Sequence, residues 1–249
     1  LGSGTKLCDM LTDRDKEYVA ELLLGVETDT QDTTGSVLRE SPVTVTEEEV
    51  SRACLSFLGD YDQIPPMYSA LKVDGKKLYE LARAGKEVER KARRVRILEL
   101  EILEMRLPVV KLRVVCSKGT YIRTLCSDIG QKLGCGGAMQ SLQRTKVGRF
   151  RLEDALTLGE LQQLKDSGEL ERVVQPVDSL FEETPALHVT AEAARLLENG
   201  NALFPAQFAE TVTPEPERWV RVYRPDGRFA GIYAYEEQKR WYRPVKMFL

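Results

Sequence analysis

Histidine is almost absent from this sequence, because His188 is the only one among 249 residues. Histidine is the side chain whose charge ordinarily changes near neutral pH, so its scarcity argues against acid–base chemistry that depends on it. No cysteine lies near His188 in the sequence to share a zinc ion with it. P-loop, dinucleotide-binding, GxSxG and HExxH motifs are also missing. These absences exclude several common enzyme classes.

The five cysteines contain no CxxC pair, and no apolar run reaches the roughly 18 residues that a membrane-spanning helix needs. Scattered cysteines, odd in number, argue against a disulfide framework. We therefore expect free thiols, a reducing cytoplasmic location and no membrane-spanning helix.

Charge is arranged in alternating blocks, although the net formal charge is only −3. Residues 1–65 carry 5 basic and 14 acidic side chains, whereas residues 66–150 carry 19 basic and 8 acidic ones. Residues 151–218 are acidic again, and residues 219–249 are basic. Such asymmetry is typical of a protein that binds a polyanion with part of its surface, although blocks that merely face solvent give the same pattern.

Hydrophobic periodicity predicts an α+β fold. Alternating apolar and charged residues predict strands over 95–104 and 111–116, and helical spacing predicts helices over 46–58 and 121–133, the second capped by Thr120. Residues 14–24 are compatible with a strand or a helix. From about residue 186 a short helix and a hairpin around Pro225-Asp226-Gly227 predict a small β-rich domain.

Arg123 stands out because it lies in the first turn of a predicted helix, where a cation opposes the helix dipole. An arginine in that position is expected to have a carboxylate or phosphate partner, although an exposed surface arginine is the simpler alternative. Lys118, Gly119 and Thr120 precede it and suit the binding of an anion.

A strongly basic segment lies between Lys72 and Arg96, with 10 basic and 4 acidic side chains. Tyr68 and Tyr79 are interleaved with the charges, which suits binding along a phosphate backbone. The alternative is a solvated charged loop. Because its charges repel one another, we expect the segment to be mobile without RNA.

A series of motifs runs in a fixed order through residues 1–150. They are LGxxTKL at 1–7, KEY at 16–18, GxxTDTxDxxG at 25–35, PPMYSALK at 65–72, GKKLYELARxG at 75–85, SKGTYIRxL at 117–125, KLGCG at 132–136 and LxR at 142–144. Their order and spacing resemble the TruB-type tRNA pseudouridine synthases. The region from about residue 186 resembles the PUA domain often attached to this family.

The resemblance implies isomerisation of one uridine in the T-loop of tRNA to pseudouridine, through base flipping and a carboxylate nucleophile. It implies a catalytic domain built on a mixed or antiparallel sheet over residues 1–180, followed by a PUA-like RNA-binding domain over residues 186–249. It also implies no cofactor or metal, a tRNA T-stem-loop as partner, no obligate protein partner and no membrane.

The resemblance further implies roles for individual residues. Tyr18 resembles the tyrosine that stacks on the flipped base and helps proton transfer from its C5 atom. Arg123 resembles the arginine paired with the catalytic aspartate, Asp32 its second acidic neighbour, and Leu142 an apolar wall of the pocket. The stretch 66–94 resembles an insertion that folds over the T-stem-loop. The substrate-binding residues implied in this way are Tyr68, Lys72, Lys76, Lys77, Lys118, Thr120, Leu142 and Arg144.

The family's nucleophile stands in a Gly-x-Leu-Asp-Pro motif, upstream of the segment that matches residues 1–7, and the sequence contains no such motif. We therefore expect residues 1–249 to be part of a longer protein, and by themselves to bind T-stem-loop RNA without converting uridine. Two alternatives remain: a non-catalytic tRNA-binding or tRNA-folding protein, and a modifying enzyme that works within a guide-RNA particle.

Overall fold

The computed structural model describes residues 2–73, 75–211 and 213–249, and these form two compact units. One unit is Met10–Ala155, and the other joins the described residues up to Asp9 with Leu156–Leu249. The domain limits expected from the sequence, 1–180 and 186–249, stay predictions. No helix among the described residues is long and apolar enough to cross a bilayer.

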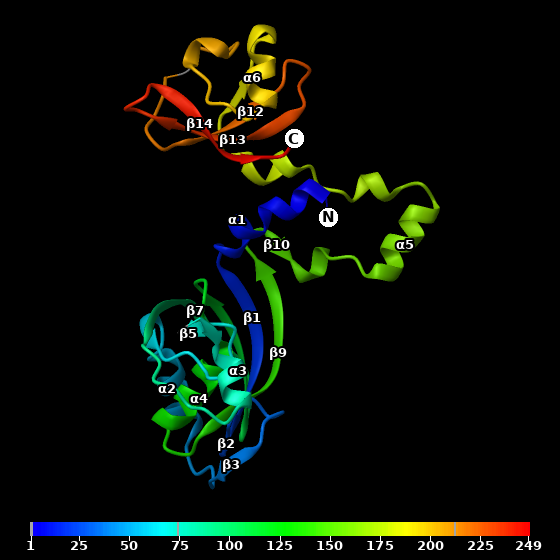
Figure 1. Ribbon diagram of the computed structural model, residues 1–249. Helices are drawn as coiled ribbons and strands as arrows, with labels where there is room; N and C mark the ends of the chain where they lie inside the picture. The colour runs from blue at the N-terminus through cyan, green and yellow to red at the C-terminus, as the bar shows by residue number, and fades with distance from the viewer. Residues whose placement is uncertain (1, 74, 212) are drawn as a thin grey trace. The chain divides into compact units, whose positions relative to one another are not determined.

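The Met10–Ala155 unit is built on a six-stranded antiparallel sheet in the order β10-β9-β1-β8-β7-β4 (Figure 1). Its strands are β1 (Lys16–Leu24), β4 (Gly59–Gln63), β7 (Arg93–Arg106), β8 (Val109–Cys116), β9 (Gly137–Val147) and β10 (Phe150–Arg151). The strands predicted over 95–104 and 111–116 are confirmed as β7 and β8. The segment that the sequence left open, 14–24, forms the central strand β1.

One face of this sheet carries the hydrophobic core. Alternate residues of β1, from Tyr18 to Leu24, are buried, as are alternate residues of β8. The helices α2 (Glu47–Leu55) and α4 (Ile122–Lys132) contribute their apolar faces to the same cluster. Both helices confirm predictions, although α2 ends at Leu55 rather than near residue 58. The mixture of helices with an antiparallel sheet confirms the α+β class.

Smaller elements flank this core. The hairpin of β2 (Val26–Thr28) and β3 (Val37–Glu40) encloses the loop of residues 29–36. The 3₁₀ helix at Gly2–Leu7 belongs to the other unit, and α1 (Cys8–Thr12) contains the boundary between Asp9 and Met10. The basic segment contains the paired strands β5 (Lys72–Val73) and β6 (Lys76–Lys77), followed by α3 (Leu78–Arg83). Since Leu78 is only 1% exposed, the segment has a small apolar centre and is more than a charged loop.

The second unit contains a four-stranded sheet with its own apolar core. Its strands are β11 (Ala186–His188), β12 (Trp219–Tyr223), β13 (Phe229–Glu236) and β14 (Trp241–Met247), and its helices are α5 (Leu158–Asp166) and α6 (Ala194–Glu198), with 3₁₀ turns between them. The predicted hairpin is confirmed, because β12 and β13 pair around Gly227, whose φ of 81° suits a glycine. All five cysteines are free thiols.

Candidate active site

Arg123, the second residue of α4, is held by three different groups. One guanidinium nitrogen lies 3.5 Å from a carboxylate oxygen of Asp32, and the other donates a hydrogen bond to the main-chain carbonyl of Tyr68. The guanidinium also lies 5.9 Å from the centre of the Tyr121 ring. The side chains of Arg123 and Asp32 are only 22% and 17% exposed. The anionic partner of this arginine within the described residues is thus a largely buried carboxylate.

Asp32 lies in the loop between β2 and β3, where backbone hydrogen bonds attach its neighbours to Met139 of β9. One carboxylate oxygen accepts hydrogen bonds from both the amide and the hydroxyl of Thr34. Burial favours the neutral carboxyl, but these hydrogen bonds, the Thr30 hydroxyl and the charge of Arg123 outweigh it and lower the pKa of Asp32. The carboxylate is therefore ionised at neutral pH and available to orient a cation.

Tyr18, Leu142 and Arg144 lie on the same face of the sheet as α4. Tyr18 in β1 is directly opposite Arg144 in β9, and Ala20 is opposite Leu142. The Arg144 Nε atom donates to the Tyr18 hydroxyl over 3.2 Å, and its guanidinium lies 5.4 Å from the ring centre. Tyr18 is 8% exposed, whereas Leu142 is 44% exposed. The exposed Leu142 thus lies on β9 between Arg144, which contacts Tyr18, and Met139. Met139 in turn forms backbone hydrogen bonds with the loop that carries Asp32.

The loop before α4 contains Lys118 and Thr120, and only the helix cap expected of Thr120 differs from the structure. The Thr120 hydroxyl donates to the carbonyl of Ser117 over 2.9 Å, and it closes that turn instead of capping the helix. The predicted Thr120 cap is therefore wrong, because α4 has Tyr121 at its N-cap position and no side chain of its own accepts there. Lys118 is exposed and forms an ion pair with Asp13.

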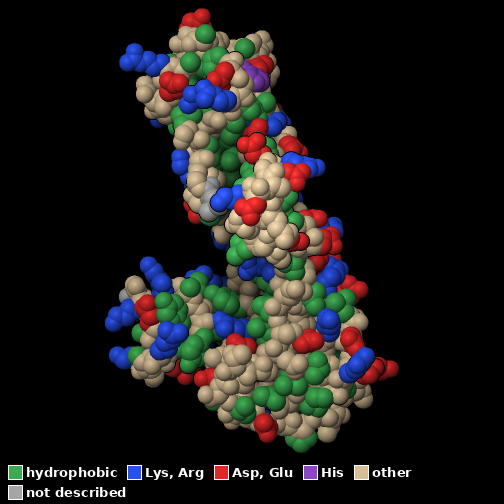
Figure 2. All heavy atoms as spheres, turned by 90° about the vertical axis from the view of Figure 1, so that its right-hand side faces the viewer, with side chains coloured by type: hydrophobic (Ala, Val, Ile, Leu, Met, Phe, Trp, Pro, Cys, Tyr) green, Lys and Arg blue, Asp and Glu red, His purple; other side chains and the backbone are tan. Residues whose placement is uncertain are grey.

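The predicted RNA-binding lysines lie on the separate two-stranded sheet of β5 and β6. Lys72 and Lys76 are exposed, and the Lys77 ammonium lies 3.3 Å from the Tyr79 hydroxyl and 5.4 Å from the centre of its ring. Lysine and arginine side chains project from the small lobe that these elements form at the lower left of Figure 2. Tyr68 lies within the 66–94 stretch, and its main-chain carbonyl contacts Arg123, so it connects this stretch with the Arg123 site.

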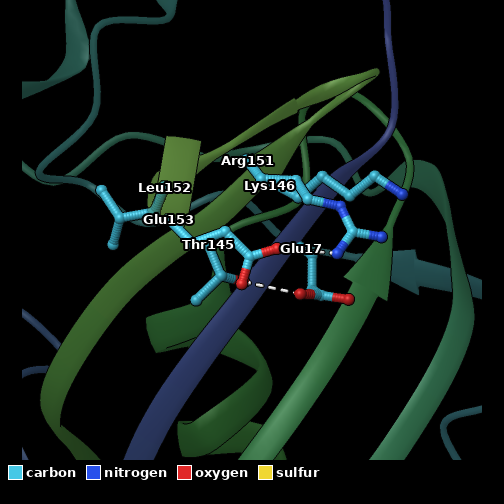
Figure 3. A pocket seen from close by; sticks show the side chains of 6 residues that line it. All are labelled: Glu17, Thr145, Lys146, Arg151, Leu152 and Glu153. Atoms are coloured by element: carbon cyan, nitrogen blue, oxygen red, sulfur yellow. Dashed lines mark hydrogen bonds and ion pairs between the residues drawn. The ribbon is translucent and has the colours of Figure 1, made fainter. Parts of the chain in front are cut away.

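A hollow of about 370 Å³ lies on the opposite face of the sheet (Figure 3). It is lined by Glu17, Thr145, Lys146, Arg151, Leu152 and Glu153. Glu17 points away from Tyr18 because neighbouring strand residues face opposite sides of a sheet. One Glu17 oxygen accepts from Thr145 over 2.8 Å and the other from Arg113 over 3.0 Å. None of the catalytic or substrate-binding residues predicted from the sequence is among the residues that line this hollow.

Sequence reasoning missed two residues that organise the site. Thr34, which hydrogen-bonds Asp32, has a local signal, since an aspartate two residues before a threonine is typical of an Asx turn. Gln63, which hydrogen-bonds Tyr121, has none, because the two are 58 positions apart. Among the described residues, no cluster of three or more His, Cys, Asp or Glu side chains is placed to hold a metal ion.

Comparison with known proteins identifies the class. Residues 1–122 match the TruB family pseudouridylate synthase N-terminal domain, and residues 123–182 match the tRNA pseudouridylate synthase B C-terminal domain. The fold is similar to that of a Cbf5–Nop10–Gar1 complex, with a TM-score of 0.69 and 23% identity over 100% of this chain and 71% of that one. The six-stranded sheet and its flanking helices thus form a pseudouridine-synthase-type fold, and the second unit of the chain contains a four-stranded sheet.

Two relatives narrow this class to a family. A protein of Lachnoclostridium phytofermentans is 49% identical over 259 residues, covering 100% of this chain and 84% of its own length. A protein of Alkaliphilus oremlandii is 45% identical over 223 residues, covering 90% of this chain and 74% of its own length. Both are named tRNA pseudouridine synthase B. The chain belongs to the TruB family of pseudouridylate synthases, which are isomerases.

Proposed function

We propose that this protein isomerises one uridine in the T-loop of tRNA to pseudouridine. The names of its relatives support a tRNA substrate. The observation that carries the proposal is the pairing of Arg123 with the largely buried carboxylate of Asp32. The Asp32 loop is attached to β9, the strand that holds Arg144 against Tyr18 and carries the exposed Leu142. This arrangement combines a fixed cation, an apolar wall and a phenol on the face of the sheet that also carries α4.

In the proposed reaction the target uridine leaves the stack and enters this face. The bond between N1 and the ribose breaks, the uracil turns, and a bond from C5 to the ribose forms. C5 loses its proton and N1 gains one, so that the product is an isomer of the substrate. The nucleophile is the carboxylate of the family's Gly-x-Leu-Asp-Pro motif. Arg123 holds that carboxylate ionised and oriented, because a neighbouring cation stabilises the charged form. Leu142 lines the pocket for the base.

Tyr18 is assigned the transfer of the C5 proton. Its hydroxyl oxygen already accepts a hydrogen bond from Arg144, so the orientation of the hydroxyl is restricted and its own hydrogen remains available for another acceptor. The Arg144 guanidinium lies over one face of the Tyr18 ring. It moves away if the flipped base stacks on that face, and it stays if the base stacks on the opposite face. Where the guanidinium stays, it keeps a cation beside the phenol oxygen and stabilises negative charge developing on it.

The test measures pseudouridine in a T-stem-loop RNA, after incubation with a polypeptide in which a Gly-x-Leu-Asp-Pro segment of the family precedes residue 1. We expect conversion of one loop uridine without added cofactor. The control RNA carries cytidine at that position. Tight binding of the RNA with no conversion contradicts the proposal and favours a tRNA-binding or tRNA-folding protein.

The basic segment should supply phosphate contacts that are measurable with residues 1–249 alone. Replacing the exposed Lys72 and Lys76 by alanine should reduce the slope of log K against log salt by about two, since each lost phosphate contact removes about one released ion. Binding of T-stem-loop RNA across a salt series measures this slope.

The matched control removes two arginines from the second unit. Arg224 and Arg243 are paired with Glu198 and Glu217 within that unit, so their replacement should change the slope little. An equal fall in slope for both double variants contradicts the assignment of RNA binding to the basic segment.

A further inference from the structure

Gln63, the last residue of β4, forms two hydrogen bonds with a single residue of another element. Its side-chain oxygen accepts from the main-chain N–H of Tyr121 over 2.8 Å, and its side-chain nitrogen donates to the Tyr121 carbonyl over 3.0 Å. Gln63 is only 1% exposed. A buried primary amide with both polar ends satisfied in this way fixes the backbone that it contacts.

The residue that Gln63 holds begins the helix that carries Arg123. Tyr121 is the N-cap of α4, and none of the capping hydrogen bonds comes from its own side chain. The first turn of a helix leaves backbone N–H groups without partners inside the helix. Thr120 does not cap the helix: its hydroxyl donates to the Ser117 carbonyl, and Tyr121 rather than Thr120 stands at the N-cap position. Gln63 therefore holds the start of α4 from outside the helix, at the peptide that precedes its first turn.

Arg123 needs such support because its position is unfavourable. A cation at the N-terminus of a helix opposes the helix dipole. Arg123 stays there by contacts to Asp32, to the Tyr68 carbonyl and to the Tyr121 ring. Two of these three contacts involve residues that are connected to Gln63. Gln63 holds the backbone of Tyr121 through hydrogen bonds, and Tyr68 follows Gln63 closely along the chain.

We propose that Gln63 is a positioning residue for Arg123. It fixes the Tyr121 peptide, and thereby the start of α4, so that the guanidinium is aimed at its carboxylate partner before RNA binds. The inference rests on the proposed function, since it concerns the rate of the isomerisation. Pre-set geometry of this kind accounts for large rate effects, because a displacement of about 1 Å costs on the order of 100-fold in rate.

Strand β4 itself provides the matched control. Tyr61, two residues before Gln63, donates a hydrogen bond from its hydroxyl to Asp128, which lies further along α4. Both contacts attach the same strand to the same helix, but only the Gln63 contact lies at the end that carries Arg123. Tyr61→Phe removes the hydrogen bond to Asp128 and the interaction of the Tyr61 hydroxyl with the Gln63 side chain, but it leaves both hydrogen bonds between Gln63 and Tyr121 in place.

The experiment measures single-turnover rates, RNA affinity and melting temperature for Gln63→Met and Tyr61→Phe, in the polypeptide that carries the Gly-x-Leu-Asp-Pro segment. Gln63→Met should lower the rate about 30- to 100-fold. Its affinity for T-stem-loop RNA should stay within about threefold, since no proposed phosphate contact is lost. Hydrogen exchange at the Tyr121 amide should become faster. Tyr61→Phe should lower the melting temperature but change the rate less than about threefold.

A second variant gives a pH signature that general loosening does not produce. In Gln63→Glu, an ionised carboxylate still accepts from the Tyr121 N–H but has no hydrogen to donate to the carbonyl, whereas the protonated acid does both. Because burial raises the pKa of a glutamate, the ratio of the Gln63→Glu rate to the wild-type rate should rise as the pH falls from 8 to 5.5.

The outcomes separate this inference from the proposed function. An active wild-type protein with an equally active Gln63→Met variant overturns the positioning role alone, and so does an equal loss of rate in Gln63→Met and Tyr61→Phe. A flat ratio for Gln63→Glu across the pH range contradicts the hydrogen-bond mechanism. A wild-type protein that binds RNA but forms no pseudouridine overturns the proposed function, and the positioning role with it.

Discussion

Replacing Arg123 by alanine should lower the rate of pseudouridine formation about 1,000-fold while the affinity for T-stem-loop RNA changes only a few-fold. Arg123 is largely buried and bound to Asp32 and to the Tyr68 carbonyl, so it is poorly placed to contact a phosphate at the surface. Its loss removes the cation that stabilises a reacting carboxylate, and removal of one such preorganised group typically costs 10²–10³-fold in rate. Single-turnover rates and equilibrium binding, measured on the same preparations, give both quantities.

Arg123→Lys and Lys132→Ala serve as comparisons. Lysine keeps the charge but not the two-pronged geometry that reaches both Asp32 and the Tyr68 carbonyl, so its rate should lie between those of wild type and alanine. Lys132 ends the same helix and lies over the Phe57 ring, so its replacement tests the general effect of losing a cation from α4. If Arg123→Ala loses RNA affinity in proportion to activity, Arg123 is a phosphate contact and its assigned role is wrong.

Tyr18→Phe should lower the rate of pseudouridine formation about 100-fold or more, because general acid–base groups typically contribute 10²–10⁴-fold. The ring remains to stack on the base, so RNA affinity should stay close to that of wild type. The lost hydrogen bond from Arg144 is a single one, worth about 1 kcal/mol, so the variant should remain folded. Loss of tritium from C5 of the target uridine follows the proton transfer directly.

A second substitution separates the two parts of the Tyr18 side chain. Tyr18→Leu removes both ring and hydroxyl, and it should weaken binding of the flipped base in addition to slowing the reaction. A Tyr18→Phe variant that reacts at the wild-type rate contradicts the proton-transfer role. In that case the Arg144–Tyr18 contact has a packing function only.

Local sequence patterns were sufficient to predict the strands and helices whose hydrophobic periodicity is clear. The alternation of apolar and charged residues in β7, and the spacing of apolar residues in α4, follow directly from burial of one face, so each was predicted close to its observed limits. The segment that forms β1 was ambiguous because its run of apolar residues near Leu22 suits either structure. Only its pairing with β8 on one side and β9 on the other settles the matter.

The candidate site shows the same division. Arg123, Asp32 and Tyr18 were found from motifs and from the unfavourable charge at a helix start, which are properties of short stretches of chain. The helix cap was predicted wrongly at Thr120. A hydroxyl near a helix start can accept a hydrogen bond from a helix N–H or donate one to a preceding carbonyl, and the sequence does not show which bond forms. Gln63 was not found at all, since its partner is 58 positions away.

By itself the sequence determined the family, the α+β class, the strands β7 and β8, the helices α2 and α4, and the residues that carry charge into the site. These follow from local periodicity and from motifs whose spacing is visible along the chain. Only the tertiary structure decided that β9 holds Arg144 against Tyr18 and that Gln63 holds the start of α4. Sheet register and helix docking set these contacts, and both arise from burial of the whole core rather than from any one segment.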